Sequence, residues 1–288
     1  VDGWTDRPVW PQGNNLSDPD NSKKPEGMDW DLWVGPEKNN GYIPGLHAFD
    51  WRGYWDYGTG SLGDMGCHLM DVPIKALGLF DPYSVEASIS RLPYVRSYTP
   101  ADVSSSSVPA SSIVTYRFNP SKLNDSKVKF TWMDGGLRPS QPDQIKEDIG
   151  VGGILIYGEK GIISCNDYGT RAKLYIDGEV VETGNFDGIP SNSFNHYTSW
   201  VEAMVDGYGS DKHKNLNSGF DVAGPISEVV LLGNVAVRSG LLKRSPRSNV
   251  FIGRKRLDYD SKNMVITNFD QANQFLTREY RKGWELNI

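Results

Sequence analysis

The sequence predicts an α+β fold, in which a large, open, predominantly antiparallel β-sheet has helices packed on one face. Three observations predict it. A helical pattern occupies residues 61–78, a block of alternating apolar and polar segments follows from residue 84 to residue 181, and helical spacing then returns. Because strands and helices are segregated rather than alternating, a parallel doubly wound sheet is disfavoured.

Composition excludes several classes of protein. The 288 residues are 38% hydrophobic and 23% charged, which is ordinary for a globular chain of one large or two small domains. The net charge of −6 gives no broad basic field, so we expect no nucleic-acid partner. No apolar run approaches the roughly 20 residues of a membrane span. Cys67 and Cys165 cannot form a disulfide framework, and they leave the compartment undecided.

The N-terminal part is predicted to consist of short elements and long loops. Residues 1–9 could form a strand, and residues 29–34 read as one helical turn closed by Gly35-Pro36. Residues 37–60 follow no regular pattern but are rich in aromatic side chains. A long loop in a compact domain is usually functional or disordered, and the aromatic residues argue against disorder.

The remaining elements follow from periodicity. Asp177-Gly178 marks a hairpin turn between two short strands, and the Ser-rich residues 100–112 are expected to form a mobile loop. Period-two segments predict strands at 84–90, 113–118, 127–132, 153–157, 161–165, 173–176 and 179–181. Apolar residues at helical spacing predict helices at 193–206, 225–239 and 271–280.

A G-x-G-x-x-G pattern at Gly58, Gly60 and Gly63 invites interpretation as a dinucleotide-binding turn. That motif needs a buried strand before it and an acidic residue at the end of a second strand about 20 positions later. Residues 49–56 are aromatic, polar and broken by glycine, and no suitable acidic residue follows. We therefore reject the dinucleotide interpretation and expect Gly63 and Gly66 to let another segment or a ligand approach the helix closely.

On a helical wheel, residues 61–78 have a narrow polar strip of Asp64, His68, Asp71 and Lys75. Ser61 with Asp64 also fits a capping pattern, which is the structural explanation for that carboxylate. The strip lies between two apolar stripes, so we expect a buried helix whose polar groups are paired or face a cavity. The stripes are Leu62, Met65, Leu69, Val72 and Ala76, and Cys67, Met70, Ile74 and Leu77.

His68 is the candidate proton acid and base, because a histidine flanked by carboxylates behind an aromatic loop is suited to that work. Asp64 is the second candidate catalytic residue. Asp71 could orient His68 or pair with Lys75 one turn later. No His, Cys and Asp set has metal-ligand spacing, so we predict no metal.

Asp71 is also a candidate for binding substrate, together with three further residues. Arg52 and Tyr57 could hold hydroxyl groups, although a surface ion pair and a core aromatic residue are equally good explanations. His196 begins a predicted helix from which it could reach a cleft, but a histidine at a helix start is more often structural.

The segment from Asp64 to Asp71 resembles the D-x-G-x-H-x-x-D signature in the substrate domain of Gfo/Idh/MocA-type oxidoreductases, the family of glucose–fructose oxidoreductase and inositol dehydrogenase. Residues 30–36, 51–60, 232–238 and 280–284 agree with it. The resemblance implies a sugar-like substrate held against a nucleotide-binding domain and a homo-oligomer formed through the open sheet face. It also implies that His68 is the acid/base and that Asp64 holds the sugar hydroxyl and tunes His68.

One large part of the family pattern is missing. There is no credible nucleotide fingerprint and no E-K-P motif, and the nearest approach to that motif, Lys23-Lys24-Pro25, lies in a polar loop. We therefore expect residues 1–288 to be the C-terminal substrate domain alone, without the N-terminal Rossmann domain. NAD or NADP would be bound mainly by that missing domain, and we expect no cofactor in this chain.

The resemblance implies an NAD(P)-dependent sugar or cyclitol dehydrogenase, in which His68 takes a proton from a ring hydroxyl as hydride leaves the same carbon. Two alternatives stay open. One is an NAD-dependent glycosidase of the same fold, and the other is a non-catalytic carbohydrate-binding or assembly module that uses its aromatic residues as platforms. The sequence leaves open which sugar is bound and whether the nucleotide is NAD or NADP.

Overall fold

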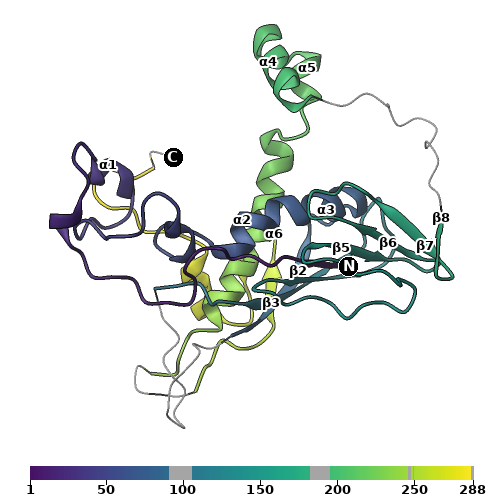
Figure 1. The fold of residues 1–288 in the computed structure, drawn as a ribbon, viewed down its shortest axis with the longest axis horizontal. Helices are drawn as coiled ribbons and strands as arrows, with labels where there is room; N and C mark the ends of the chain where they lie inside the picture. Colours follow the sequence, from purple (N-terminus) through teal and green to yellow (C-terminus); the bar gives the residue numbers. More distant parts are fainter. Residues whose placement is uncertain (91–105, 182–194, 246–247, 249, 287–288) are drawn as a thin grey trace.

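A ten-stranded open sheet with helices on one face forms the body of the protein (Figure 1). The computed structural model describes residues 1–90, 106–181, 195–245, 248 and 250–286. Within them the strand order is β10-β9-β2-β3-β4-β1-β5-β6-β7-β8. All neighbouring strands pair antiparallel except β1 and β4. The predicted fold class is confirmed.

The strands between residues 82 and 181 lie where the alternating pattern predicts them. The turn at Asp177-Gly178 has φ angles of 50° and 81°, the left-handed backbone that a tight hairpin requires. Two C-terminal strands were not predicted, and the first strand is shorter than residues 1–9. The strands are β1 Asp2–Trp4, β2 Pro82–Ile89, β3 Ser112–Phe118, β4 Val128–Met133, β5 Gly153–Tyr157, β6 Ile162–Cys165, β7 Lys173–Ile176, β8 Glu179–Val181, β9 Leu257–Asp260 and β10 Val265–Ile266.

The helices differ more from the prediction than the strands do. The single helix predicted at 61–78 is two helices, the predicted helix at 271–280 is a 3-10 helix that ends at Phe275, and α5 was not predicted. Residues 193 and 194 of the predicted helix at 193–206 lie outside the described residues. The α-helices are α1 Trp30–Val34, α2 Gly60–Leu69, α3 Asp71–Leu77, α4 His196–Asp206, α5 Asp211–Lys214 and α6 Phe220–Ser239, and the 3-10 helices are η1 Asn21–Lys23, η2 Asp50–Gly53 and η3 Asp270–Phe275.

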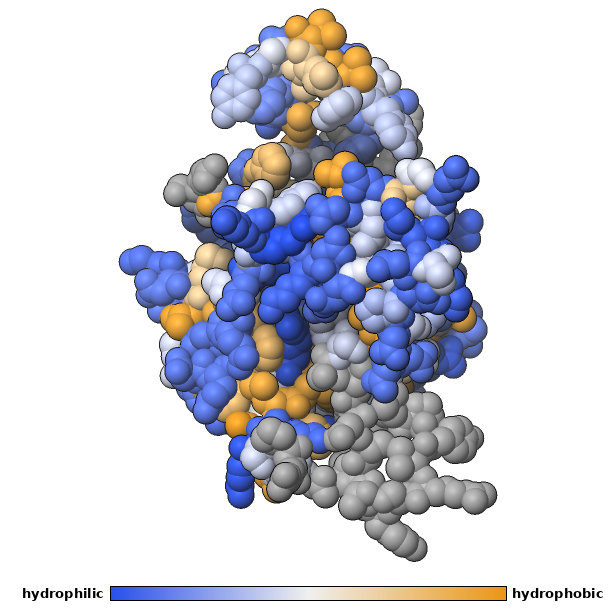
Figure 2. All heavy atoms as spheres, turned by 90° about the vertical axis from the view of Figure 1, so that its left-hand side faces the viewer, coloured by the Kyte–Doolittle hydropathy of each residue, from blue (hydrophilic) through white to orange (hydrophobic). Residues whose placement is uncertain are grey.

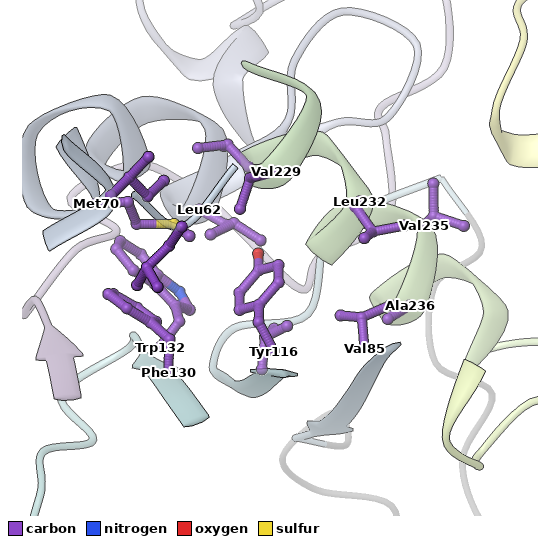
Figure 3. Packing of buried hydrophobic residues seen from close by; sticks show 14 of the residues in the cluster. Leu62, Met70, Val85, Tyr116, Phe130, Trp132, Val229, Leu232, Val235 and Ala236 are labelled. Atoms are coloured by element: carbon purple, nitrogen blue, oxygen red, sulfur yellow. The ribbon is translucent and has the colours of Figure 1, made fainter. Parts of the chain in front are cut away.

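The main core lies between the sheet and the helices α2, α3 and α6 (Figures 1 and 3). Tyr116, Phe130 and Trp132 rise from β3 and β4 and are fully buried under Leu62 of α2 and Leu232 of α6. Burying each such side chain contributes roughly 1.5–3 kcal/mol. This packing fixes α2 against the sheet and thereby decides which of its faces is left outside.

The opposite face of the sheet is covered in part. Trp4 and Leu155 form a second core there with Ile145, which lies in the segment after β4, and the Trp4 indole donates to the carbonyl of Gly150 over 3.1 Å. On β2 and β3 the same face carries an ion pair between Arg117 and Glu86. The expected self-association through the open face stays a prediction.

Helix α6 is long and apolar enough to cross a membrane by length and composition. Its sequence holds no uninterrupted apolar run of that length, because Asp221 and Glu228 lie within it. Half of its apolar window is nevertheless buried inside the protein. Val229 and Leu232 are among its buried residues and pack into the main core. The central helix of a globular core has the same composition.

Helices α4 and α5 stand beyond the far end of α6, away from the sheet (Figure 1). Apolar side chains gather on this projection (Figure 2). Val205 and Tyr208 are 80% and 96% exposed, and Trp200 is 57% exposed. The helical periodicity of residues 196–206 therefore describes an amphipathic helix whose apolar face is uncovered in the described structure.

The aromatic loop is ordered by a small core of its own. Trp30, Tyr42, Leu46 and Tyr54 are buried together, and Trp30 stacks on Trp33 with ring centroids 4.6 Å apart. Packing thus explains much of the aromatic content, and the argument against disorder is confirmed.

The Ser-rich segment predicted to be a mobile loop is partly fixed. Residues 100–105 lie outside the described residues. The hydroxyl of buried Ser107 donates to the carbonyl of Gly53 and accepts from the amide of Gly13. The expectation of mobility is therefore wrong for residues 106–112, because their hydroxyls satisfy buried backbone groups.

Asp134, at the end of β4, makes stability depend on pH. Burial raises the pKa of Asp134 from 3.8 to about 6, although hydrogen bonds from Trp132 and Ser112 act to lower it. Between these values the folded chain holds a proton that the unfolded chain has released. The contribution of Asp134 to the free energy of unfolding therefore falls by up to about 3 kcal/mol as pH rises through this window.

Urea unfolding at pH 4 and pH 6.5 checks this prediction, with Asp134→Asn as the comparison because an amide does not titrate. We expect the wild-type protein to lose more stability than the variant between the two values. Equal losses in both proteins would contradict the assignment.

Candidate functional site

The candidate site lies on the face of α2 that points away from the core. Leu62, Met65 and Leu69 are buried against the sheet and α6, whereas Cys67 and His68 are exposed. The prediction of a buried helix is therefore wrong at Cys67, which was assigned to an apolar stripe. The accessible imidazole of His68 can meet a ligand.

The glycines before and within α2 make room for the chain itself. A Cβ on Gly63 would lie 1.7 Å from the hydroxyl oxygen of Thr59, and one on Gly66 would lie 2.9 Å from Val230 of α6. A Cβ on Gly58 would strike the backbone of Arg52. Of the two alternatives expected at these glycines, the approach of another segment is confirmed at Gly66, and these backbone groups do not form an open cradle for a pyrophosphate.

Helix α2 begins and ends differently from the prediction. Thr59 precedes it without a side-chain cap, and the buried Ser61 hydroxyl has no partner among the described residues, so the Ser61 capping pattern is wrong. The helix ends before Pro73 because this residue has no N–H to donate to the carbonyl of Leu69. α3 continues from Asp71 in nearly the same direction (Figure 1).

Asp64 is paired with Arg52 rather than with the helix start. Nε of Arg52 lies 3.3 Å from Oδ1 of Asp64, with the two side chains 27% and 30% exposed. The guanidinium also lies over the rings of Phe49 and Trp51, at 4.5 and 4.6 Å from their centroids. A pair this accessible is worth about 0–1 kcal/mol, so its main effect is to fix the position of the Asp64 carboxylate.

Tyr168 lies against the ring of His68. Their centroids are 5.3 Å apart with an interplanar angle of 68°, and Tyr168 is 62% exposed. The turn that carries Tyr168 is held by Asn166, whose side-chain oxygen accepts hydrogen bonds from the amides of Tyr168 and Thr170. Sequence reasoning missed Tyr168, because its contact with His68 spans about 100 residues and only the turn itself is visible locally.

Asp71 forms an ion pair with Lys75, which was one of the two roles expected for it. Its carboxylate lies 3.0 Å from the ammonium group of Lys75, which also donates to the carbonyl of Asn217 over 3.1 Å. Within the described residues no hydrogen bond joins the ring of His68 to Asp64 or Asp71. Asp64, His68 and Asp71 are each at least partly exposed, so they keep some hydrogen-bonding capacity for a ligand.

Tyr57 lies in a different cleft. Trp33, Trp51, Asp56 and Arg278 line this cleft with it, around a volume of 340 Å³. Burial, followed by the negative charges of Asp56 and Glu37, raises the pKa of Tyr57 to about 12, so its phenol stays protonated at neutral pH. No hydrogen bond or ring contact in the described structure joins Tyr57 to Asp64 or His68.

His196 is not brought to this site either. It is the first residue of α4, whose N-cap is Asn195, and its ring contacts Tyr197. α4 stands beyond the end of α6, whereas α2 packs beside the middle of α6 (Figure 1). In this arrangement His196 and His68 belong to separate regions of the surface.

The described residues include no group of three or more His, Cys, Asp or Glu side chains placed to hold a metal ion. The candidate site instead combines a cation, a carboxylate, an imidazole and a phenol, which come from Arg52, Asp64, His68 and Tyr168. This set can bind hydroxyl groups and can exchange a proton through the imidazole.

Comparison with known proteins agrees with the motif in this region. Residues 2–90 match the family model GFO_IDH_MocA_C2, which is described as the oxidoreductase family, C-terminal alpha/beta domain. The matched segment contains α2 and the candidate residues Arg52, Asp64 and His68. A search of curated proteins finds no match.

Proposed function

Because the chain carries a C-terminal domain of the Gfo/Idh/MocA oxidoreductase type, we propose that it forms the substrate half of an NAD(P)-dependent dehydrogenase. The substrate is a sugar or cyclitol, oxidised at a ring CH–OH group. The observation that carries the proposal is the exposed imidazole of His68 on the outward face of α2, one turn after the Asp64 carboxylate.

His68 takes the proton of the reacting hydroxyl while hydride leaves the same carbon. In the reverse direction the imidazolium returns that proton to the alkoxide. The nicotinamide, when bound, supplies the hydride acceptor. Accessibility supports this role for His68, because a proton shuttle must reach both the substrate and water.

Asp64 accepts a hydrogen bond from a sugar hydroxyl, and Arg52 keeps its carboxylate in place. The contact of Arg52 with Phe49 and Trp51 supports this role, since a guanidinium held by two rings has little freedom to move. Tyr168 borders His68 and offers both a ring face and a hydroxyl to the substrate.

The nucleotide is bound by another domain that closes over the exposed face of α2. The closed glycine backbone at Gly58, Gly60 and Gly63 supports this division of labour, because it leaves no cradle for the pyrophosphate. This chain therefore orients the sugar and handles the proton, and the partner domain positions the nicotinamide above the reacting carbon.

Incubating the full-length protein with NAD⁺ or NADP⁺ and a panel of sugars and cyclitols tests the proposal. We expect sugar-dependent growth of the reduced-nicotinamide absorbance. Cleavage of a glycoside with a tightly bound NAD that is recycled would favour the glycosidase instead. A protein that binds sugars but neither nucleotide would be a binding module, and the proposal would be wrong.

A further inference from the structure

We propose that a second small-ligand site, for a single neutral hydroxylated ring, lies between α6 and the β9–β10 hairpin. A cavity of 210 Å³ opens there, and the loop before α2 and the 3-10 helix η3 form its other walls. The residues that carry the argument are Trp55, Glu228, Asn234, Arg238, Tyr259 and Phe275.

The cavity walls hold polar atoms that have no partner. Nε1 of Trp55 and both side-chain polar atoms of Asn234 are buried and make no hydrogen bond within the described residues. Asn234 is 5% exposed, on a helix otherwise filled with aliphatic core residues. A buried amide without partners destabilises the fold, and such groups in native proteins call for an explanation. A ligand in the adjoining cavity supplies one.

The charged groups at this cavity are already engaged. The hydroxyl of Tyr259 donates to Glu228 over 2.8 Å. The guanidinium of Arg238 lies over Trp55 and Phe275, at 5.3 and 4.6 Å from their centroids, and burial lowers its pKa. Glu228 and Arg238 carry opposite charges, so the lining of the cavity has no net charge to select an ion. The ligand is therefore neutral.

The available partners also define the ligand's chemistry. An Asn amide presents a donor and an acceptor side by side, and an indole presents one donor. Neighbouring hydroxyls on a ring satisfy all three, because each hydroxyl both donates and accepts. The aromatic and aliphatic walls pack against the C–H faces of such a ring. At roughly 30 Å³ for each displaced water, the 210 Å³ hold about seven waters, which suits one monosaccharide ring.

This site is separate from the α2 face. Neither Asp64 nor His68 lines the cavity; the loop before α2 contributes Trp55, Gly58 and Thr59 to its wall. Occupation of the cavity does not depend on hydride transfer, so this site can be tested independently of the proposed enzymatic function.

The test is NMR of full-length protein carrying ¹⁵N-labelled tryptophan, titrated with D-glucose. Trp55→Phe assigns the indole resonance of Trp55. We expect this resonance to shift saturably, with the same dissociation constant in wild-type protein and in His68→Ala, and D-gluconate to leave it unmoved because it is charged and acyclic.

Asn234→Leu separates binding from folding. It removes the unpartnered amide at similar size, so we expect a raised Tm together with at least a tenfold weaker response of the Trp55 resonance to D-glucose. The proposal is overturned if D-glucose up to 100 mM leaves the wild-type Trp55 resonance in place. It is also overturned if Asn234→Leu binds D-glucose as tightly as the wild type, or if D-gluconate shifts the resonance equally.

Discussion

Replacing His68 by Ala in the full-length protein is expected to lower kcat for sugar oxidation by about 10²–10⁴-fold. In the proposed reaction the imidazole is the proton acceptor; it is exposed on α2, and its ring contact in the described structure is with Tyr168. KM is expected to change little, because Asp64, kept in place by Arg52, would still bind the sugar. Steady-state kinetics with the best sugar of the panel measures both quantities.

Cys67→Ala is the matched control, since Cys67 is the exposed neighbour of His68 on the same helix. This control should keep wild-type kinetics. Asp71→Asn should reduce kcat less than tenfold, because Asp71 is engaged with Lys75. A fully active His68→Ala enzyme, or equal losses in His68→Ala and Cys67→Ala, would remove His68 from the mechanism.

Gly233→Ala is expected to lower the free energy of unfolding by about 1–3 kcal/mol or more, because overpacking a core forces side chains and backbone to move. The new Cβ would lie 1.9 Å from the Tyr116 hydroxyl oxygen and 2.6 Å from Leu62. Tyr116 rises from β3 into the space between α2 and α6, where it has little room to retreat (Figure 3). Urea unfolding measures the loss.

The variant Tyr116→Phe provides the control. The Tyr116 hydroxyl is buried without a partner among the described residues, so its removal should cost little or raise stability. In that background Gly233→Ala should lose less than it does alone, and a double-mutant cycle gives the difference. If the loss is the same with and without the hydroxyl, the clash with Tyr116 is not what requires glycine at position 233.

The central strands were predictable because their side chains alternate between a buried and an accessible face. On β3, Val114, Tyr116 and Phe118 are fully buried while Thr115 and Arg117 between them are partly exposed. Strands β9 and β10 have four and two residues, too few for a period to be recognised. β9 becomes a strand by pairing with β2, which is remote in sequence, and β10 becomes one by pairing with β9.

Only those parts of the candidate site that lie on one predicted helix could be predicted from the sequence. The wheel grouped Asp64, His68 and Asp71 on one strip, and the structure leaves all three side chains at least partly exposed. The wheel could not show which neighbours would cover that strip. Tyr168 reaches His68 through sheet topology, and Arg52 reaches Asp64 through the course of an irregular loop.

The role of the glycines depends on tertiary packing as well, whereas the interruption at Met70 has a local cause in Pro73. Gly66 reads as a weak helix former, yet it is needed because Val230 of α6 packs against it. Spacing alone cannot distinguish a glycine that admits a ligand from one that admits a neighbouring helix.

Deuterium transfer tests the central claim most directly. A sugar that the full-length enzyme oxidises is labelled with deuterium at each ring carbon in turn, and the nicotinamide product is analysed by mass spectrometry. We predict that deuterium from one ring carbon appears in the reduced nicotinamide, and that His68→Ala slows this transfer by the same factor as kcat. Oxidised sugar without deuterium in the nicotinamide, or undiminished transfer in His68→Ala, would contradict the assignment of this chain as the proton-handling half of a sugar dehydrogenase.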